Sequence, residues 1–174
     1  MAGEILEGLV WRDQHGLKTL WPTLTPPLFG ALCAPGLLVD ALARLYGACP
    51  VVQVCAEPMA AAGKERHIKL LHNEEVLIEA YSLLPAATLA AHPWLDTLGD
   101  EALGLAFRRH GFTARSPYTF ARAQFPLLAP ATSAAPAIAR RFSFLQPEPS
   151  VSVIEVFSPG LLARFAQDSG GVSG

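Results

Sequence analysis

Hydrophobic residues between Gly36 and Tyr46 recur with the period of an α-helix. Leu38, Leu42 and Tyr46 are four residues apart, so they fall on one face of a helix. Gly47 follows directly, and a glycine in this position is a common helix end. The segment therefore predicts an amphipathic helix.

Residues 95–110 show a second helical pattern. Leu98 and Leu105 share one face of a helix, and an Arg-Arg pair near the end places positive charge against the negative end of the helix dipole. Gly111 is predicted to end this second helix.

Segments rich in β-branched and aliphatic residues predict strands in the rest of the chain. Residues 65–71 and 76–84 flank the polar run His72-Asn73-Glu74-Glu75, whose length suits the turn of an antiparallel hairpin. The connection Gln-Pro-Glu-Pro-Ser at 146–150 suits a second hairpin. The predicted strands cover residues 51–55, 65–71, 76–84, 139–145 and 151–157, and residues 112–128 are rich in strand-forming Phe, Tyr and Thr.

The order of these elements predicts an α+β fold with a largely antiparallel sheet and covering helices. No Gly-x-Gly-x-x-Gly motif follows a strand, which disfavours a dinucleotide-binding parallel sheet. The 174 residues suit one domain, which we place at residues 31–167. Residues 1–30 contain the run Trp-Pro-Thr-Leu-Thr-Pro-Pro and predict an irregular N-terminal arm, and the Gly- and Ser-rich residues 168–174 predict a disordered tail.

Composition and charge exclude several classes of partner. The chain is 51% hydrophobic and 16% charged with a formal net charge of -2, so no basic surplus indicates a nucleic-acid partner. Its apolar stretches fall short of the roughly 20 residues that span a bilayer, and its acidic N-terminus is unlike a signal peptide. We expect no membrane insertion, no export and a cytoplasmic location. Three cysteines without a CxxC motif fit free thiols in a reducing compartment.

Two charged residues fall on apolar strand faces. Arg66 shares a strand face with Ile68 and Leu70. Glu155 shares one with Val153 and its apolar neighbours. Burying an ion costs on the order of several kcal/mol unless the ion is paired. One interpretation is that the two residues pair with each other or with backbone groups. The other is a ligand pocket, in which the guanidinium binds a carboxylate and Glu155 donates or shuttles a proton.

The remaining chemistry-bearing residues give weaker signals. The five histidines lack the spacing of a metal site, and no Gly-x-Ser-x-Gly motif indicates a hydrolase nucleophile. Cys49 and Cys55 are expected to be small core residues. The pairs Arg108-Arg109 and Arg140-Arg141 are expected to be solvated, and His67 to be a satisfied partner on the second face of its strand. We expect no metal.

Four motifs, in order, resemble the chorismate-pyruvate lyase family. Arg66 in Lys-Glu-Arg-His-Ile-Lys-Leu-Leu stands where the family has its substrate-binding arginine, and the hairpin then ends in Leu-Leu-Pro as the family's strand does. Leu98-Gly99 followed by Leu103-Gly104 resembles the family's repeated Leu-Gly. An Arg-Arg pair precedes a strand, and the last strand, around Glu155, resembles the one that carries the family's site glutamate. The resemblance covers residues 36–162.

This resemblance implies a cofactor-independent lyase that converts chorismate to 4-hydroxybenzoate and pyruvate. It implies that Arg66 anchors the ring carboxylate and that Glu155 acts as an acid near the ether oxygen, both as catalytic and substrate-binding residues. It also implies that Leu103 contributes a backbone contact and that Leu38 matches a methionine contact. Where the family commonly has an arginine, this chain has Tyr81, so one positive charge is absent.

Two alternatives stay open at this stage. The first is a noncatalytic module of the same fold that binds a small aryl acid or another effector. The second is an enzyme with a related pocket that supplies or processes a different aryl acid. In the main interpretation the product enters an aromatic acid supply pathway, for ubiquinone or a secondary metabolite, and the protein is a monomer.

Overall fold

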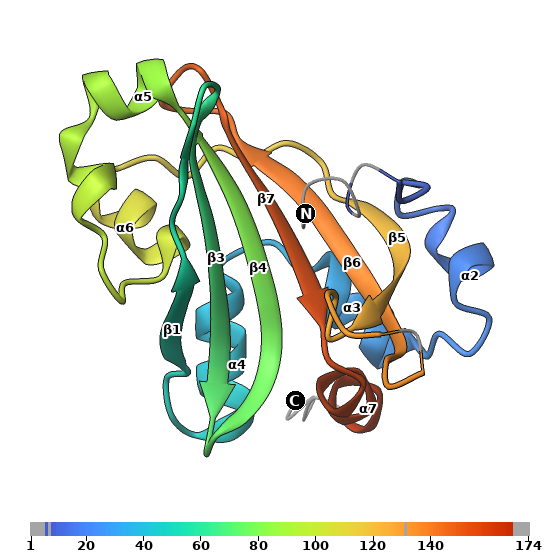
Figure 1. Ribbon diagram of the computed structural model, residues 1–174. Coiled ribbons are helices and arrows are strands. Elements are labelled where there is room, and N and C mark those ends of the chain that lie inside the picture. The colour runs from blue at the N-terminus through green and yellow to red at the C-terminus, as the bar shows by residue number, and fades with distance from the viewer. Residues whose placement is uncertain (1–5, 7, 131, 169–174) are drawn as a thin grey trace. The chain divides into compact units, whose positions relative to one another are not determined.

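The computed structural model describes residues 6, 8–130 and 132–168 (Figure 1). Its contacts group the chain into two compact units that interleave along the sequence. Unit 1 draws its described residues from the ranges 1–35, 118–140 and 156–174, and unit 2 consists of 36–117 and 141–155. Unit 2 contains every residue that the sequence singles out for chemistry, namely Leu38, Arg66, Leu103 and Glu155.

Each unit contains both helices and strands. Unit 1 contains α2 (Leu17–Leu20), α3 (Pro26–Cys33), β5 (Thr119–Phe125) and α7 (Pro159–Gln167). Unit 2 contains α4 (Leu38–Tyr46), β1 (Val51–Ala56), β2 (Met59–Ala60), β3 (Gly63–His72), β4 (Glu75–Pro85), α5 (Ala86–Ala91), the 3-10 helix η1 (Pro93–Thr97) and α6 (Leu103–Arg109). Strands β6 (Ala135–Phe144) and β7 (Val151–Phe157) contribute residues to both units.

The strands confirm the predicted α+β fold. Within the described residues they form a seven-stranded sheet in the order β1-β3-β4-β7-β6-β5, with β2 paired to β3 outside that path. Strand β3 pairs antiparallel with β1, β2 and β4. In unit 2, α5 packs against the ends of β3 and β4. None of the described helices is long and apolar enough to cross a membrane.

The hairpin of β3 and β4 forms where the polar run predicts it. Asn73 and Glu74 make the turn with φ angles of 48° and 67°, the left-handed conformation that a two-residue turn between twisted strands requires. The register places Arg66 opposite Ser82 and His67 opposite Tyr81. Burial alternates along the middle of β3, so Arg66 faces the interior as the period of two predicts.

Gly63 fixes the start of this hairpin. Its φ is +142°, and a Cβ atom at this position would lie 2.1 Å from the carbonyl oxygen of Leu84. We expect Gly63→Ala to lower the free energy of unfolding by about 2 kcal/mol, because both the backbone angle and the contact are unfavourable for a side chain. Urea unfolding followed by circular dichroism measures the change.

The matched control for this substitution is Gly30→Ala in α3, where a new Cβ would meet nothing within 4 Å. Alanine is the better helix former, so this variant is expected to be as stable as the parent or slightly more stable. Equal stability of the two variants would contradict the role given to Gly63.

The predicted helix at 36–46 is confirmed, whereas the one at 95–110 is interrupted. Helix α4 ends at Gly47, which has a φ of 73°. Residues 95–110 instead divide into η1 and α6. The break follows from Gly99, which takes a φ of 54° that does not continue a helix. Gly111, with a φ of 80°, lies just beyond the end of α6 as expected.

The structure also contains helices that the hydrophobic pattern did not predict. Helices α2 and α3 lie in the segment predicted to be irregular, and α7 follows the last strand. Both α3 and α7 begin at a proline, and the hydroxyl oxygens of Thr25 and Ser158 accept the amides of Leu28 and Leu161. A capping hydroxyl followed by proline is a helix start signal, which outweighed the helix-breaking effect assigned to the prolines. The predicted tail at 168–174 lies outside the described residues except for Asp168.

Candidate functional site

Unit 2 contains a small cavity of about 50 Å³ between α4, α6 and the sheet. Helix α4 and the start of α6 form one side, and β3, β4, β6 and β7 provide the other. The lining that matters for chemistry consists of Leu38, Ile68, Ser82, Leu103, Arg115 and Glu155. Three of the four site residues expected from the sequence, Leu38, Leu103 and Glu155, therefore lie around one cavity.

Glu155 is the acidic group of the cavity. It lies on β7 with Val153, which also lines the cavity, and its exposed fraction is 8%. The alternation of β7 predicted this burial, and the structure confirms it. The surrounding walls are mostly apolar, with Ser82 and Arg115 as the other polar or charged side chains. A carboxyl group in such a wall can meet the polar part of a ligand in surroundings of low dielectric.

Leu37 and Gly104 line the cavity where α4 and α6 begin. A Cβ atom at Gly104 would lie 2.8 Å from Cδ2 of Leu37, so a larger residue at this position would require the Leu37 side chain to shift. Leu38 and Leu103, the neighbours of this contact, are both buried and line the cavity. In the second Leu-Gly motif, Leu103 thus lines the cavity and Gly104 lies against Leu37.

Arg66 is buried on β3 but does not line the cavity. Its neighbour on the same strand face, Ile68, does, and so does Ser82, which lies opposite Arg66 on β4. Two residues along a strand span about 7 Å. The Arg66 side chain therefore begins next to the cavity and lies on the same face of the sheet.

The guanidinium of Arg66 is held by three acceptors. Its Nε donates to Oε1 of Glu57 over 2.8 Å, Nη1 donates to the carbonyl oxygen of Glu101 over 3.1 Å, and Nη2 donates to that of Gly99 over 2.5 Å. These contacts use three of the five N–H donors of the guanidinium. The expected pairing of Arg66 with backbone groups is therefore observed, whereas its acidic partner among the described contacts is Glu57 and not Glu155.

Glu57 is a residue that the sequence analysis missed. It lies between β1 and β2, and its second carboxylate oxygen is 3.3 Å from Nζ of Lys64. Lys64 is also 3.1 Å from Oδ1 of Asp96. Lys64 and Arg66 are two residues apart on β3, so their charges share one face of the strand. Two cations on one buried face require acidic partners, and that requirement is the signal that would have directed attention to Glu57.

Arg115 is the second missed residue, and it is the cationic group that lines the cavity. Its Nη1 donates to the carbonyl oxygen of Gly36 over 2.7 Å, and its guanidinium lies 5.2 Å and 5.0 Å from the ring centroids of Phe142 and Phe144. Arg115 lies in the connection between α6 and β5, which has no periodic pattern. No sequence signal placed it beside Glu155.

Tyr81 lies on the other face of the sheet from Arg66. Its ring stacks on that of His67 with centroids 4.3 Å apart, and its hydroxyl donates to Oε2 of Glu79 over 3.4 Å. Burial and the neighbouring Glu79 carboxylate raise the pKa of Tyr81. Tyr81 therefore does not line the cavity, and its neighbours Ala80 and Ser82 form the cavity lining at this part of β4.

Three predictions about single residues are wrong. His67 was expected to be satisfied, but its buried Nε2 has no hydrogen-bond partner among the described residues, and burial lowers its pKa. Cys49 and Cys55 were expected in the core but are exposed, because the loop before β1 and the edge strand β1 are largely uncovered.

Arg140 was expected to be solvated but is buried, where it donates to the carbonyl oxygen of Leu32 over 2.8 Å. Strand β6 begins at Ala135, so Arg140 lies in its middle and not at its exposed start.

The described residues contain no group of three or more His, Cys, Asp or Glu side chains arranged to hold a metal ion. The chain's own donors at the cavity are therefore a carboxyl, a guanidinium and a hydroxyl. In comparisons with known proteins, no family model and no curated protein matches this chain.

Proposed function

We propose that this protein is a cofactor-independent lyase that converts chorismate to 4-hydroxybenzoate and pyruvate. One observation carries the proposal. Leu38, Leu103 and Glu155, which come from distant parts of the sequence and match the site positions of the lyase family, line one cavity. Arg66, the fourth matching residue, lies on the same face of the sheet next to that cavity. These residues belong to α4, α6 and β7, so the fold brings them together from separate elements.

The apolar lining suits the ring of the substrate. In the reaction the ether bond to the enolpyruvyl group breaks, the ring loses a proton and becomes aromatic, and the released enol becomes pyruvate. No water and no redox partner are consumed. The reaction therefore needs a site that positions the ring and stabilises charge on the leaving oxygen, which walls of fixed side chains and one acid can provide.

Glu155, Arg66 and Arg115 act on different groups of the substrate. Arg66 uses three of its five N–H donors in protein contacts, and in this proposal its guanidinium binds the ring carboxylate. Glu155, in its protonated form, hydrogen-bonds to the ether oxygen and stabilises the negative charge that develops as the bond breaks. Arg115 supplies positive charge for the second carboxylate of the substrate, since it lines the same cavity.

Substrate entry requires the cavity to open. Ligand sites for molecules of this size have volumes of about 300 to 1,000 Å³, whereas this cavity measures about 50 Å³. The contact between Leu37 and Gly104 joins the two segments that cover it. We infer that chorismate binds when the start of α4 separates from the start of α6, and that closure then excludes water from the reacting ring.

The test is to incubate the purified protein with chorismate and to follow pyruvate and the aromatic product by chromatography. We expect equimolar pyruvate and 4-hydroxybenzoate with no added cofactor. An exposed arginine on β5, Arg122, provides a control, and Arg122→Ala is expected to retain the full rate.

Other outcomes of this assay would replace the proposal. A different benzoate would indicate an enzyme with a related pocket and another product. Absence of turnover, together with thermal stabilisation of the protein by 4-hydroxybenzoate, would indicate a binding module of the same fold.

A further inference from the structure

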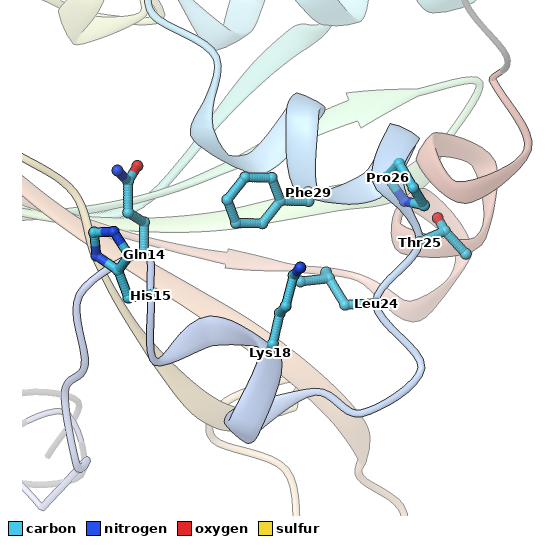
Figure 2. A pocket seen from close by; sticks show the side chains of 7 residues that line it. All are labelled: Gln14, His15, Lys18, Leu24, Thr25, Pro26 and Phe29. Carbon is cyan, nitrogen blue, oxygen red and sulfur yellow. The ribbon is translucent and has the colours of Figure 1, made fainter.

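Unit 1 contains a second and larger pocket, which shares no lining residue with the cavity of unit 2. Its volume is about 380 Å³, within the range of about 300 to 1,000 Å³ that is typical of small-molecule sites. Figure 2 shows its lining, which comes from α2, α3 and the segments that precede them. The side chains that line it are Gln14, His15, Lys18, Leu24, Thr25, Pro26 and Phe29.

Buried leucines hold the two walls of this pocket in place. Leu17 of α2 and Leu32 of α3 are fully buried, and Leu28 of α3 is nearly so. Lys18 follows Leu17 directly and is exposed, whereas Phe29 follows Leu28 and is half-buried. Each helix therefore packs into the interior through its leucines. From another face, α2 presents Lys18 to the pocket and α3 presents Phe29. The site is built on short but fixed elements.

Lys18 lines the pocket and carries a positive charge. It has no hydrogen-bond or ion-pair partner among the residues that the structure describes. His15 also lines the pocket, but its Nδ1 lies 3.7 Å from Oδ2 of Asp13. The amide of Gly16 donates to Oδ1 of Asp13 over 3.0 Å and lowers the pKa of that carboxyl group, which stays ionised at neutral pH. No acidic side chain lines the pocket. One positive charge is thus available to a ligand.

The rest of the lining combines an apolar surface with neutral polar groups. Figure 2 shows Lys18 extending from α2 toward the ring of Phe29, with Leu24 beside it. Phe29 offers a face or an edge to an aromatic ligand. Thr25 accepts the amide of Leu28 with its hydroxyl oxygen and keeps its proton for a further hydrogen bond.

We propose that this pocket binds a small anion that carries one carboxylate on an aromatic ring system. The single cation pairs with one carboxylate of the ligand. The ring of Phe29 and the aliphatic Leu24 and Pro26 select a flat apolar body over a simple inorganic anion. The volume accommodates one or two fused rings.

Isothermal titration calorimetry with 2-naphthoate tests this proposal. We expect the wild-type protein to bind 2-naphthoate, and to bind neither acetate, which lacks the ring, nor 2-naphthamide, which lacks the charge. Lys18→Met keeps the length of the side chain without its charge and is expected to weaken binding about tenfold, the value of one charge-assisted hydrogen bond. Phe29→Leu is expected to weaken binding also, by loss of the ring contact.

Two controls separate this pocket from the cavity of unit 2. Arg122→Met removes an exposed cation elsewhere in unit 1 and is expected to leave the affinity unchanged. Glu155→Gln alters the cavity and is also expected to leave it unchanged. Absence of 2-naphthoate binding by the wild type would overturn the proposal, and so would binding that Glu155→Gln weakens and Lys18→Met does not. Chorismate turnover, measured separately, does not decide between these outcomes.

Discussion

Replacing Arg66 with methionine is expected to lower the free energy of unfolding by about 3 kcal/mol. The substitution leaves the Glu57 carboxylate without its 2.8 Å partner and removes the donor from the carbonyl oxygens of Gly99 and Glu101. Methionine fills a similar volume, so the loss reports on charge and hydrogen bonding more than on packing. Glu57 keeps Lys64 at 3.3 Å, which limits the cost. Urea unfolding at neutral pH measures it.

An exposed ion pair in the same unit provides the matched control. Nη1 of Arg108 lies 2.7 Å from Oδ2 of Asp40, with both side chains substantially exposed. Arg108→Met is expected to cost less than about 1 kcal/mol, since solvent screens the pair. The double variant Arg66→Met, Glu57→Gln should recover part of the stability that Arg66→Met loses. Equal costs for the Arg66 and Arg108 variants would show that the buried contacts do not hold the fold together.

The structural role of Arg66 bears directly on the proposed function. Its contacts fix the loop that contains Gly99 and Glu101, and this loop leads into α6, where Leu103 lines the cavity. Arg66 therefore positions one wall of the cavity even before a substrate binds. Activity of an Arg66 variant has to be measured under conditions where the variant is folded, because lost turnover in an unfolded protein says nothing about substrate binding.

The period of two in the strands predicted the burial of both charged residues. Arg66 and Glu155 are 2% and 8% exposed, as their apolar neighbours indicated. Helix α4, the first hairpin and strand β7 also lie where the hydrophobic pattern and the turn residues place them. These features depend on neighbours in the sequence, and local patterns carry that information.

The partners of these charges could not be predicted in the same way. Glu57 reaches Arg66 from a loop, Arg115 enters the cavity from an irregular connection, and the carbonyl oxygens that bind Arg66 follow a break in a predicted helix. Each contact joins segments whose approach is fixed by the fold as a whole. A buried cation predicts that an acceptor exists, but the identity of the acceptor depends on tertiary packing.

Glu155→Gln is expected to reduce kcat for chorismate by about 100-fold to 10,000-fold, the range that general acids contribute. Glutamine has nearly the same volume and can still donate a hydrogen bond, but it cannot transfer a proton. The fold should be kept, because glutamine has nearly the volume of glutamate and can form hydrogen bonds at the same buried position on β7. Steady-state kinetics with pyruvate detection measures kcat, and urea unfolding checks the fold.

The matched control is Glu148→Gln in the exposed connection between β6 and β7, which should change neither kcat nor stability by a measurable amount. The contrast between the two variants separates proton transfer from general loss of negative charge. If Glu155→Gln retained the parent kcat, Glu155 would be a ligand for the polar end of the substrate and not its acid. Catalysis would then rest on the arginines and on the apolar walls, which stabilise the aromatising ring without proton transfer by Glu155.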